Sequence, residues 1–194
     1  MNDRRFASLL PSLVAAGQLV AIAATLVGSL GYQFILGELP CPLCVAQRLA
    51  FLLACVGPVG ILRSNAAGQR SGADQARGFA MTIFASLVGA AASIRQILLH
   101  IIPPDAGYGP PVMGIHLYSW ALVVFACLIA SSAVGLLGLC ENPAPLPRPA
   151  INGLTLSVVG IAVIIALATF AMEGFAFLLP ADPARYELFH LLVR

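Results

Sequence analysis

Lysine is absent from this chain of 194 residues: its ten basic residues are all arginines, and with eight acidic residues they bring the charged share to only 9%. A soluble domain carries roughly a quarter charged residues, so this composition excludes an ordinary water-soluble protein. The formal net charge of +2 is too small and too scattered for a nucleic-acid partner. Hydrophobic residues make up 60% of the chain, which indicates an integral membrane protein in contact with lipid.

Five long apolar stretches predict five membrane-spanning helices, since about 20 apolar residues cross the hydrocarbon core. Arg4 and Arg5 precede the first stretch, as basic residues do in a signal peptide. That stretch is too long for the apolar region of a signal peptide and has no cleavage site before Cys41, so we interpret it as a retained helix. The predicted stretches are residues 6–37, 44–62, 79–102, 117–139 and 151–172.

The arginines are unevenly distributed between the loops. The N-terminus and the loops 63–78 and 140–150 carry arginines, whereas the segments 37–40 and 103–115 contain no basic residue. Because basic loops stay on the cytoplasmic side, we expect the N-terminus and the two basic loops to lie in the cytoplasm. Cys41, Cys44, the loop 103–116 and the tail from Glu173 should then face outward.

A proline-rich stretch, Glu141-Asn-Pro-Ala-Pro-Leu-Pro-Arg-Pro149, separates the fifth span from the other four. Proline cannot continue a helix, so the stretch should be a stiff linker. The sequence therefore predicts an all-α integral membrane protein, a four-helix transmembrane bundle plus a fifth C-terminal transmembrane helix. We expect a four-helix membrane redox unit over 1–140, a cytoplasmic linker over 141–150, and the fifth helix with an outward-facing tail over 151–194.

The reactive chemistry lies in the segment Leu39-Pro-Cys-Pro-Leu-Cys-Val-Ala-Gln-Arg48. Cys41 and Cys44 at a helix start can close a small disulfide, and the helix N-terminus stabilises a thiolate there. Pro42 suits the first helical turn, where its missing N–H is not needed. Arg48 lies one turn beyond Cys44, so its guanidinium can stabilise a thiolate or donate hydrogen bonds to a carbonyl at the membrane interface.

Three simpler interpretations compete with a redox role. A structural disulfide between Cys41 and Cys44 would close too short a loop to stabilise much. A zinc site would need a second pair of ligands, and no further C-x-x-C or C-x-x-H motif completes one, so we expect no metal. Arg48 could also extend to the lipid headgroups without touching the cysteines, and its spacing from Cys44 is what favours a functional role.

The Cys41-Pro-Leu-Cys44-x-x-x-Arg48 motif between two spans resembles the disulfide bond formation protein B family. The similarity extends through the four-helix unit and includes Gly114-Ile-His-Leu-Tyr-Ser-Trp120 at the fourth span. The resemblance implies a multi-pass protein of the bacterial inner membrane with its active site facing the periplasm. It also implies that a periplasmic thioredoxin-fold dithiol oxidase is re-oxidised and that the electrons pass to a membrane quinone, ubiquinone or menaquinone. Cys41 and Cys44 would then be catalytic, with Cys44 facing the quinone and Arg48 helping to hold it.

The chain departs from the family in its remaining cysteines. Typical members carry a second cysteine pair in the second outer loop, but residues 103–116 contain no cysteine here. Cys55 and Cys127 fall at mid-span, where a free cysteine behaves as a small apolar residue. Cys140 should lie at the cytoplasmic end of the fourth span, about 33 Å from the motif and beyond disulfide reach. We therefore expect Cys41 itself to exchange with the partner.

Other polar residues near the outer face are weaker candidates for binding the quinone. Arg95 lies within the third span, and an intramembrane arginine indicates function, although extension to the headgroups or helix pairing would also explain it. His100 closes that span, and the resemblance implies a quinone-side histidine near this place. Gln47 stands where the family has an acidic residue, which puts proton delivery in doubt. We interpret His116, Tyr118 and Trp120 as an interfacial aromatic belt.

The sequence therefore predicts a quinone-dependent, disulfide-generating membrane oxidoreductase with one cysteine pair. One alternative is a non-catalytic quinone- or lipid-binding subunit of a larger membrane complex, which the missing second pair favours. Another is a thiol relay that exports reducing power, for which Cys55 and Cys127 would have to exchange across facing helices. The redox state and midpoint potential of the Cys41–Cys44 pair, with and without quinone, would discriminate between them.

Overall fold

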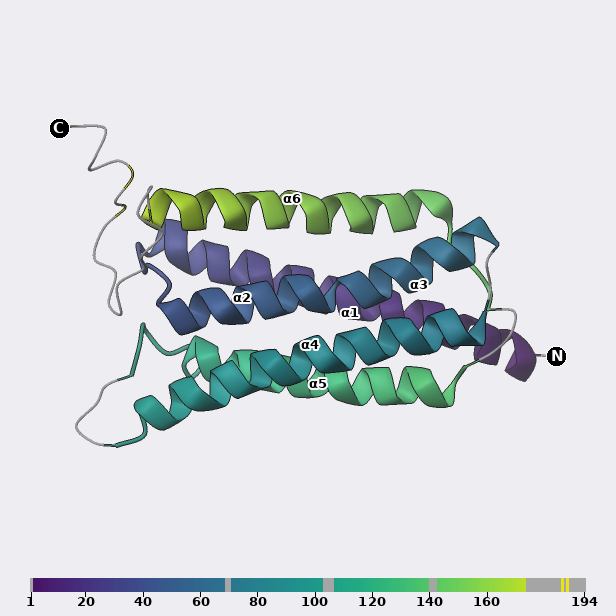
Figure 1. Ribbon diagram of the computed structural model, residues 1–194, viewed down its shortest axis with the longest axis horizontal. Helices are drawn as coiled ribbons and strands as arrows, with labels where there is room; N and C mark the ends of the chain where they lie inside the picture. Colours follow the sequence, from purple (N-terminus) through teal and green to yellow (C-terminus); the bar gives the residue numbers. More distant parts are fainter. Residues whose placement is uncertain are drawn as a thin grey trace.

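The computed structural model describes residues 2–68, 71–102, 107–139 and 143–173, together with Tyr186 and Leu188. The helices run side by side and form an elongated bundle (Figure 1). They are α1 (Asn2–Ile35), α2 (Pro42–Ala54), α3 (Val56–Ala67), α4 (Gly72–Leu99), α5 (Leu117–Leu137) and α6 (Arg148–Glu173). With α2 and α3 counted as one span, five segments of the described chain are long and apolar enough to cross a membrane. The predicted all-α fold with five spans is confirmed.

The helices extend beyond the apolar stretches that predicted them. α4 begins at Gly72, well before the predicted start at residue 79, because Ser71 caps it and accepts a hydrogen bond from the Ala73 N–H at 3.1 Å. Asp74 lies in the first turn, where a carboxylate is favoured by the helix dipole. Charged residues end an apolar window but not a helix, so hydropathy alone predicts the span and not the cap.

Cys55 alone separates α2 from α3 within the second span. The cause is Pro58, which has no N–H to donate to the carbonyl of Ala54 four residues earlier. The Thr82 hydroxyl of α4 lies 3.4 Å from that carbonyl oxygen and can donate to it. The backbone group freed by proline therefore has a partner where no water is available, and the span remains a single membrane-crossing unit.

α4 approaches its neighbours through glycines. A Cβ atom at Gly57 of α3 would lie 2.1 Å from the carbonyl oxygen of Gly78, so only glycine allows these two backbones to touch. A Cβ at Gly89 would lie 2.1 Å from the ring of Phe125 on α5. Phe125 stacks in turn on Phe51 of α2, with ring centroids 3.9 Å apart. Small residues on α4 thus determine how closely α3 and α5 pack.

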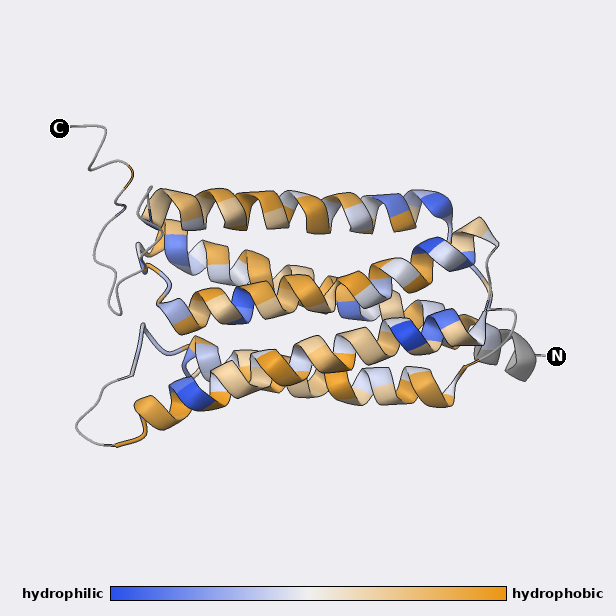
Figure 2. Ribbon diagram, in the orientation of Figure 1, coloured by the Kyte–Doolittle hydropathy of each residue, from blue (hydrophilic) through white to orange (hydrophobic). Residues whose placement is uncertain are grey.

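Apolar side chains form both the core and the outer surface of the bundle. All six helices contribute buried residues to one core cluster, among them Leu19, Phe51, Ile61, Phe79, Phe125 and Ile165. Other large apolar side chains point outward along the helices, among them Val20, Phe84, Val123 and Leu167. Figure 2 shows that hydrophobic residues predominate over the middle of the bundle. Such a surface suits contact with lipid tails.

The two ends of the bundle differ in charge. Arg63, Arg77 and Arg148 lie at the end where α3 finishes and where α4 and α6 begin, and hydrophilic residues gather there (Figure 2). Cys41 lies at the opposite end, beside the start of α2 (Figure 1). Arg63, Arg77 and Arg148 are therefore at the opposite end of the bundle from the cysteine pair.

α6 packs along the bundle, mainly against α1. Its residues Ile151, Ile161 and Ile165 belong to the common core cluster. The preceding segment is also tied to α1, because the Ala144 N–H donates to the Ser8 carbonyl at 2.8 Å. The predicted division into a four-helix unit, a linker and an added helix stays a prediction, and most of the tail lies outside the described residues.

α6 begins earlier than the predicted linker allowed. The helix starts at Arg148, and Pro149 occupies its first turn, where a missing N–H breaks no intrahelical bond. Residues 143–147 are non-helical, as the prolines require.

Candidate active site

Cys41 and Cys44 are close together because Cys41 is the N-cap residue of α2. Its sulfur accepts a hydrogen bond from the Cys44 N–H at 3.4 Å, and Pro42 fills the first helical position. The two sulfur atoms are 3.0 Å apart, and both cysteines are free thiols. Cys41 is 6% exposed and Cys44 is half-buried. A small side-chain rotation would bring the sulfurs to bonding distance, so the pair can alternate between dithiol and disulfide.

The surroundings of Cys41 favour its protonated form. The hydrogen bond with the Cys44 side chain, followed by burial, raises the pKa of the Cys41 thiol well above its usual range. Cys41 therefore stays protonated near neutral pH in the reduced pair.

Gln96 of α4 contacts both cysteines and is held in turn by Gln47 of α2. The amide nitrogen of Gln96 lies 3.3 Å from the sulfur of Cys41 and 3.3 Å from that of Cys44. The amide oxygen of Gln96 accepts a hydrogen bond from Gln47 at 2.9 Å, which fixes the orientation of the amide. Gln96 is fully buried, so water does not compete for these contacts. The arrangement places a neutral donor against both sulfurs.

Arg48 is buried beside the pair and is held by α1. Its guanidinium donates to the side-chain oxygen of Gln33 at 2.6 Å and to the backbone carbonyl of Ser29 at 2.9 Å. Arg48 is 6% exposed, and among the described residues the ion pair between Arg77 and Asp74 is the only one. A guanidinium has five N–H donors, so it can hold these two oxygens and still donate to a ligand. Both of these hydrogen-bond acceptors are uncharged, so the guanidinium is solvated by neutral oxygen atoms and is not paired with a carboxylate.

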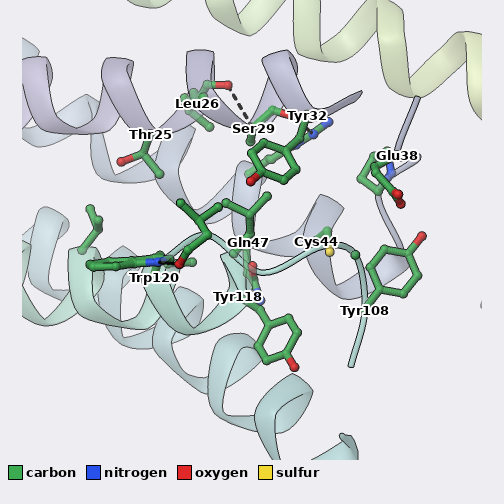
Figure 3. Close-up of a pocket in the computed structure, with 18 of the residues that line it drawn as sticks. Thr25, Leu26, Ser29, Tyr32, Glu38, Cys44, Gln47, Tyr108, Tyr118 and Trp120 are labelled. Carbon is green, nitrogen blue, oxygen red and sulfur yellow. Dashed lines mark hydrogen bonds between the residues drawn. The ribbon is translucent and has the colours of Figure 1, made fainter. Parts of the chain in front are cut away.

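A cavity of about 360 Å³ lies next to Cys44 and Arg48. Figure 3 shows side chains from α1, from the start of α2 and from the start of α5 around it. Its walls are mostly apolar and aromatic, and the polar residues Cys44, Gln47 and Arg48 are part of its lining. The lining includes Thr25, Ser29, Tyr32, Glu38, Cys44, Gln47, Arg48, Phe51, Tyr108, Tyr118 and Trp120. An apolar pocket with a few convergent donors is typical of a site for a flat organic ligand.

The structure brings together three of the predicted site residues, Cys41, Cys44 and Arg48. Arg95 is exposed on α4 and does not line the cavity. The ring of His100 stacks on Tyr118, with centroids 5.8 Å apart, and so reaches the cavity only through that tyrosine.

The aromatic residues at the start of α5, interpreted from the sequence as an interfacial belt, have specific contacts within the protein. Tyr118 and Trp120 line the cavity, and the Trp120 indole N–H donates to the Val112 carbonyl at 3.1 Å. The ring of His116 stacks on Tyr118, with centroids 5.2 Å apart.

Sequence reasoning missed Gln96 and Gln33. Both are buried amides within otherwise apolar spans, Gln33 at 1% exposure. A glutamine facing lipid tails would leave polar groups without partners, so its presence in a span was a signal for a buried contact.

The other cysteines are separated from the pair. Cys55 is buried at the junction of α2 and α3, and Cys127 is exposed on the outer surface of α5. Cys140 lies outside the described residues. Within the part of the chain that the structure describes, no cluster of three or more histidine, cysteine or acidic side chains could hold a metal ion.

The chain is similar in sequence to known proteins. Residues 11–109 match the sequence model of the family described as disulfide bond formation protein DsbB. Disulfide bond formation protein B of Burkholderia thailandensis is 28% identical over 144 residues, covering 59% of this chain and 82% of the relative. Disulfide bond formation protein B 1 of Pseudomonas fluorescens is 29% identical over 159 residues, covering 69% and 89% respectively.

A third relative, disulfide bond formation protein B of Chromobacterium violaceum, is 38% identical over 88 residues, or 43% of this chain and 51% of the relative. No solved structure matches the chain significantly. The chain belongs to the disulfide bond formation protein DsbB family, and it is a multi-pass membrane protein.

Proposed function

We propose that this protein oxidises the dithiol of a periplasmic thioredoxin-fold protein through Cys41 and Cys44 and passes the electrons to a membrane quinone. Family membership supports the coarser part, a membrane thiol oxidase that generates disulfides. The observation that supports the finer part is the cavity, which Cys44 and Arg48 line together. The charge asymmetry of the two ends supports an inner-membrane protein whose cysteine pair faces the periplasm.

The cavity fits the head group of a quinone. Phe51, Tyr118 and Trp120 offer ring surfaces for a flat aromatic or quinoid ring. Arg48 and Gln47 offer N–H donors on the side of Cys44, and such donors suit the carbonyl oxygens of a quinone. A quinone bound there would accept the two electrons and two protons of the dithiol and leave the pair as a disulfide.

The cysteines act in a fixed order. In the oxidised protein a thiolate of the partner attacks the Cys41 sulfur, the Cys41–Cys44 bond breaks, and Cys44 leaves as a thiolate. The second thiolate of the partner then attacks its own sulfur in the mixed disulfide, which releases an oxidised partner and a reduced Cys41. The donors of Gln96 and the charge of Arg48 stabilise the Cys44 thiolate as it leaves.

The partner must uncover Cys41 to reach it. The side chain is 6% exposed, and the Tyr108 hydroxyl donates to the carbonyl of Leu39, two residues before the cysteine. Access to Cys41 therefore requires the residues packed around it to move.

Two experiments test this function. A Cys44→Ser variant keeps only Cys41 of the pair, and a partner whose second cysteine is replaced by serine cannot release itself, so after oxidation with diamide, non-reducing electrophoresis of the membranes should show this partner joined to Cys41 by a disulfide. The trapped species should disappear with reductant, and Cys41→Ser is the mirror control. Because Trp120 is the single tryptophan and lines the cavity, a short-chain ubiquinone or naphthoquinone should quench its fluorescence saturably.

The proposed function is contradicted if neither variant traps a partner and the wild-type protein shows no saturable quenching and no quinone reduction with a reduced dithiol protein. The chain would then be better described as a non-catalytic subunit.

A further inference from the structure

Gln33 of α1 contacts Arg48 of α2, Met172 of α6 and Tyr186 of the tail. It lies on α1 and is 1% exposed. Its side-chain oxygen accepts from Arg48 at 2.6 Å. Its side-chain nitrogen donates to the sulfur of Met172 at 3.3 Å and lies 3.2 Å from the hydroxyl of Tyr186. Met172 is in the last turn of α6, and Tyr186 follows that helix.

The contacts on the nitrogen side fix the direction of the Gln33 amide. An amide has an acceptor end and a donor end, and Arg48 can only donate. If the amide were rotated by half a turn, its N–H groups would meet the guanidinium and no hydrogen bond could form. Met172 and the Tyr186 hydroxyl accept from the nitrogen, so they hold the oxygen towards Arg48. Met172 in the last turn of α6 and Tyr186 in the following tail therefore influence the guanidinium indirectly, through the orientation of the Gln33 amide.

We infer that Gln33 is a positioning residue that makes quinone affinity depend on α6. α6 lies outside the residues 11–109 that match the family model, so this coupling adds a part of the chain that the family match does not include. A buried guanidinium is costly unless its donors are satisfied, and Gln33 and Ser29 supply the two oxygens that fix it beside the cavity. The inference rests on the proposed function, because the ligand that Arg48 is positioned to meet is the quinone.

The test measures quinone binding in full-length variants by quenching of Trp120 with a short-chain ubiquinone. Gln33→Met keeps the length of the side chain but removes both hydrogen-bonding ends, and we expect the apparent Kd to rise about tenfold, the value of one charged hydrogen bond. Tyr186→Phe removes one hydroxyl and should raise the Kd about threefold. Turnover at saturating quinone should change little, so the effect should appear in KM and not in kcat.

Gln18 offers a matched control on the same helix. It is buried at 3% exposure, and its amide donates to Ser132 at 2.8 Å and to Ser131 at 2.9 Å, away from the cavity lining. Gln18→Met should lower thermal stability without changing the Kd for quinone. A purely structural role of Gln33 would give the same result for Gln33→Met.

A double variant separates positioning from direct contact. If Gln33 acts through Arg48, then Gln33→Met should cause no further loss in an Arg48→Ala background. If the wild-type protein binds quinone and Gln33→Met has the same Kd, this inference alone is overturned. It is also overturned if the losses of binding free energy caused by the two substitutions are fully additive in the double variant. A wild-type protein that shows no saturable quenching overturns the proposed function, and this inference with it.

Discussion

At the scale of single residues, the chemistry of the cysteine pair is governed by neutral amides. Gln96 and Gln47 are uncharged at every pH, so the hydrogen bonds from Gln96 to the sulfurs and from Gln47 to Gln96 persist when the surroundings titrate. The cation, Arg48, lies one turn further along α2 and faces the cavity. Gln96 therefore contacts the sulfurs directly, whereas the proposed role of Arg48 is towards the quinone and the departing thiolate.

Replacing Gln96 by leucine should make the pair harder to reduce. A donor to sulfur stabilises the thiolate of the reduced form, and a hydrogen bond to a charged group contributes about 1.5–3 kcal/mol. Its loss should shift the midpoint potential by about 30–60 mV to more negative values, measured by equilibration in thiol redox buffers followed by alkylation.

Ser93 provides the control for this prediction. It is buried one turn earlier on α4 and donates to the carbonyl of Gly89 at 3.0 Å, so Ser93→Ala should leave the potential where it is. An unchanged potential in Gln96→Leu would remove the amide from the redox chemistry.

A second prediction follows from the raised pKa of Cys41. The hydrogen bond with Cys44 is the larger cause and burial the smaller one, so Cys44→Ala should lower the pKa of Cys41 without restoring its usual value. More thiolate is then present at a given pH, and alkylation of Cys41 should become faster at pH 8. Its pH profile, read by peptide mass spectrometry, should move to lower pH. A profile that stays in place would contradict the origin of the shift.

The remaining cysteines should be dispensable. Cys55 is buried and Cys127 faces outward from α5, and neither touches the pair. Replacement of Cys55, Cys127 and Cys140 by alanine together should preserve quinone reduction within about twofold. A folded but inactive triple variant would reveal a relay through them.

At the scale of helices, the packing around α4 leaves no space at its glycines. Gly89→Ala would force a methyl group into the Phe125 ring, which stacks on Phe51 in the cavity wall. We expect a loss of about 1–3 kcal/mol in stability together with weaker quinone binding. Gly17→Ala in α1 is the control, because no atom lies within 4 Å of its added Cβ, and it should be neutral or slightly stabilising. Equal stability of the two variants would refute the packing argument.

The helices were predictable and their contacts were not. Length and hydropathy are properties of single segments, so the five spans could be predicted. Cys41, Cys44 and Arg48 could be grouped because their spacing of three and four residues places them on one face of a helix. Gln96 contacts Cys41 from 55 residues away, and Gln33 contacts Arg48 from another helix. Which helices meet depends on tertiary packing, such as the glycine contacts of α4, and no local pattern encodes it.

At the scale of the whole molecule, the uneven charge of the two ends predicts an orientation in the membrane. A reporter fused after Arg148 should lie in the cytoplasm, and one fused after Arg194 should lie in the periplasm, since α6 is long and apolar enough to cross the bilayer between them. Alkaline phosphatase, which is active only after export, distinguishes the two sides. Equal activity at both positions would mean that α6 does not cross.

The contact between Gly57 and Gly78 also bears on how the protein is made. These glycines are 21 residues apart in the sequence, on either side of the short connection between α3 and α4. A contact so close along the chain closes at little entropic cost, so the α3–α4 hairpin can form as soon as both helices have entered the bilayer. Synthesis of α5 and α6 follows later, and they meet a hairpin that is already docked. A larger residue at Gly57 should therefore reduce the amount of protein that reaches the membrane intact, whatever its effect on turnover.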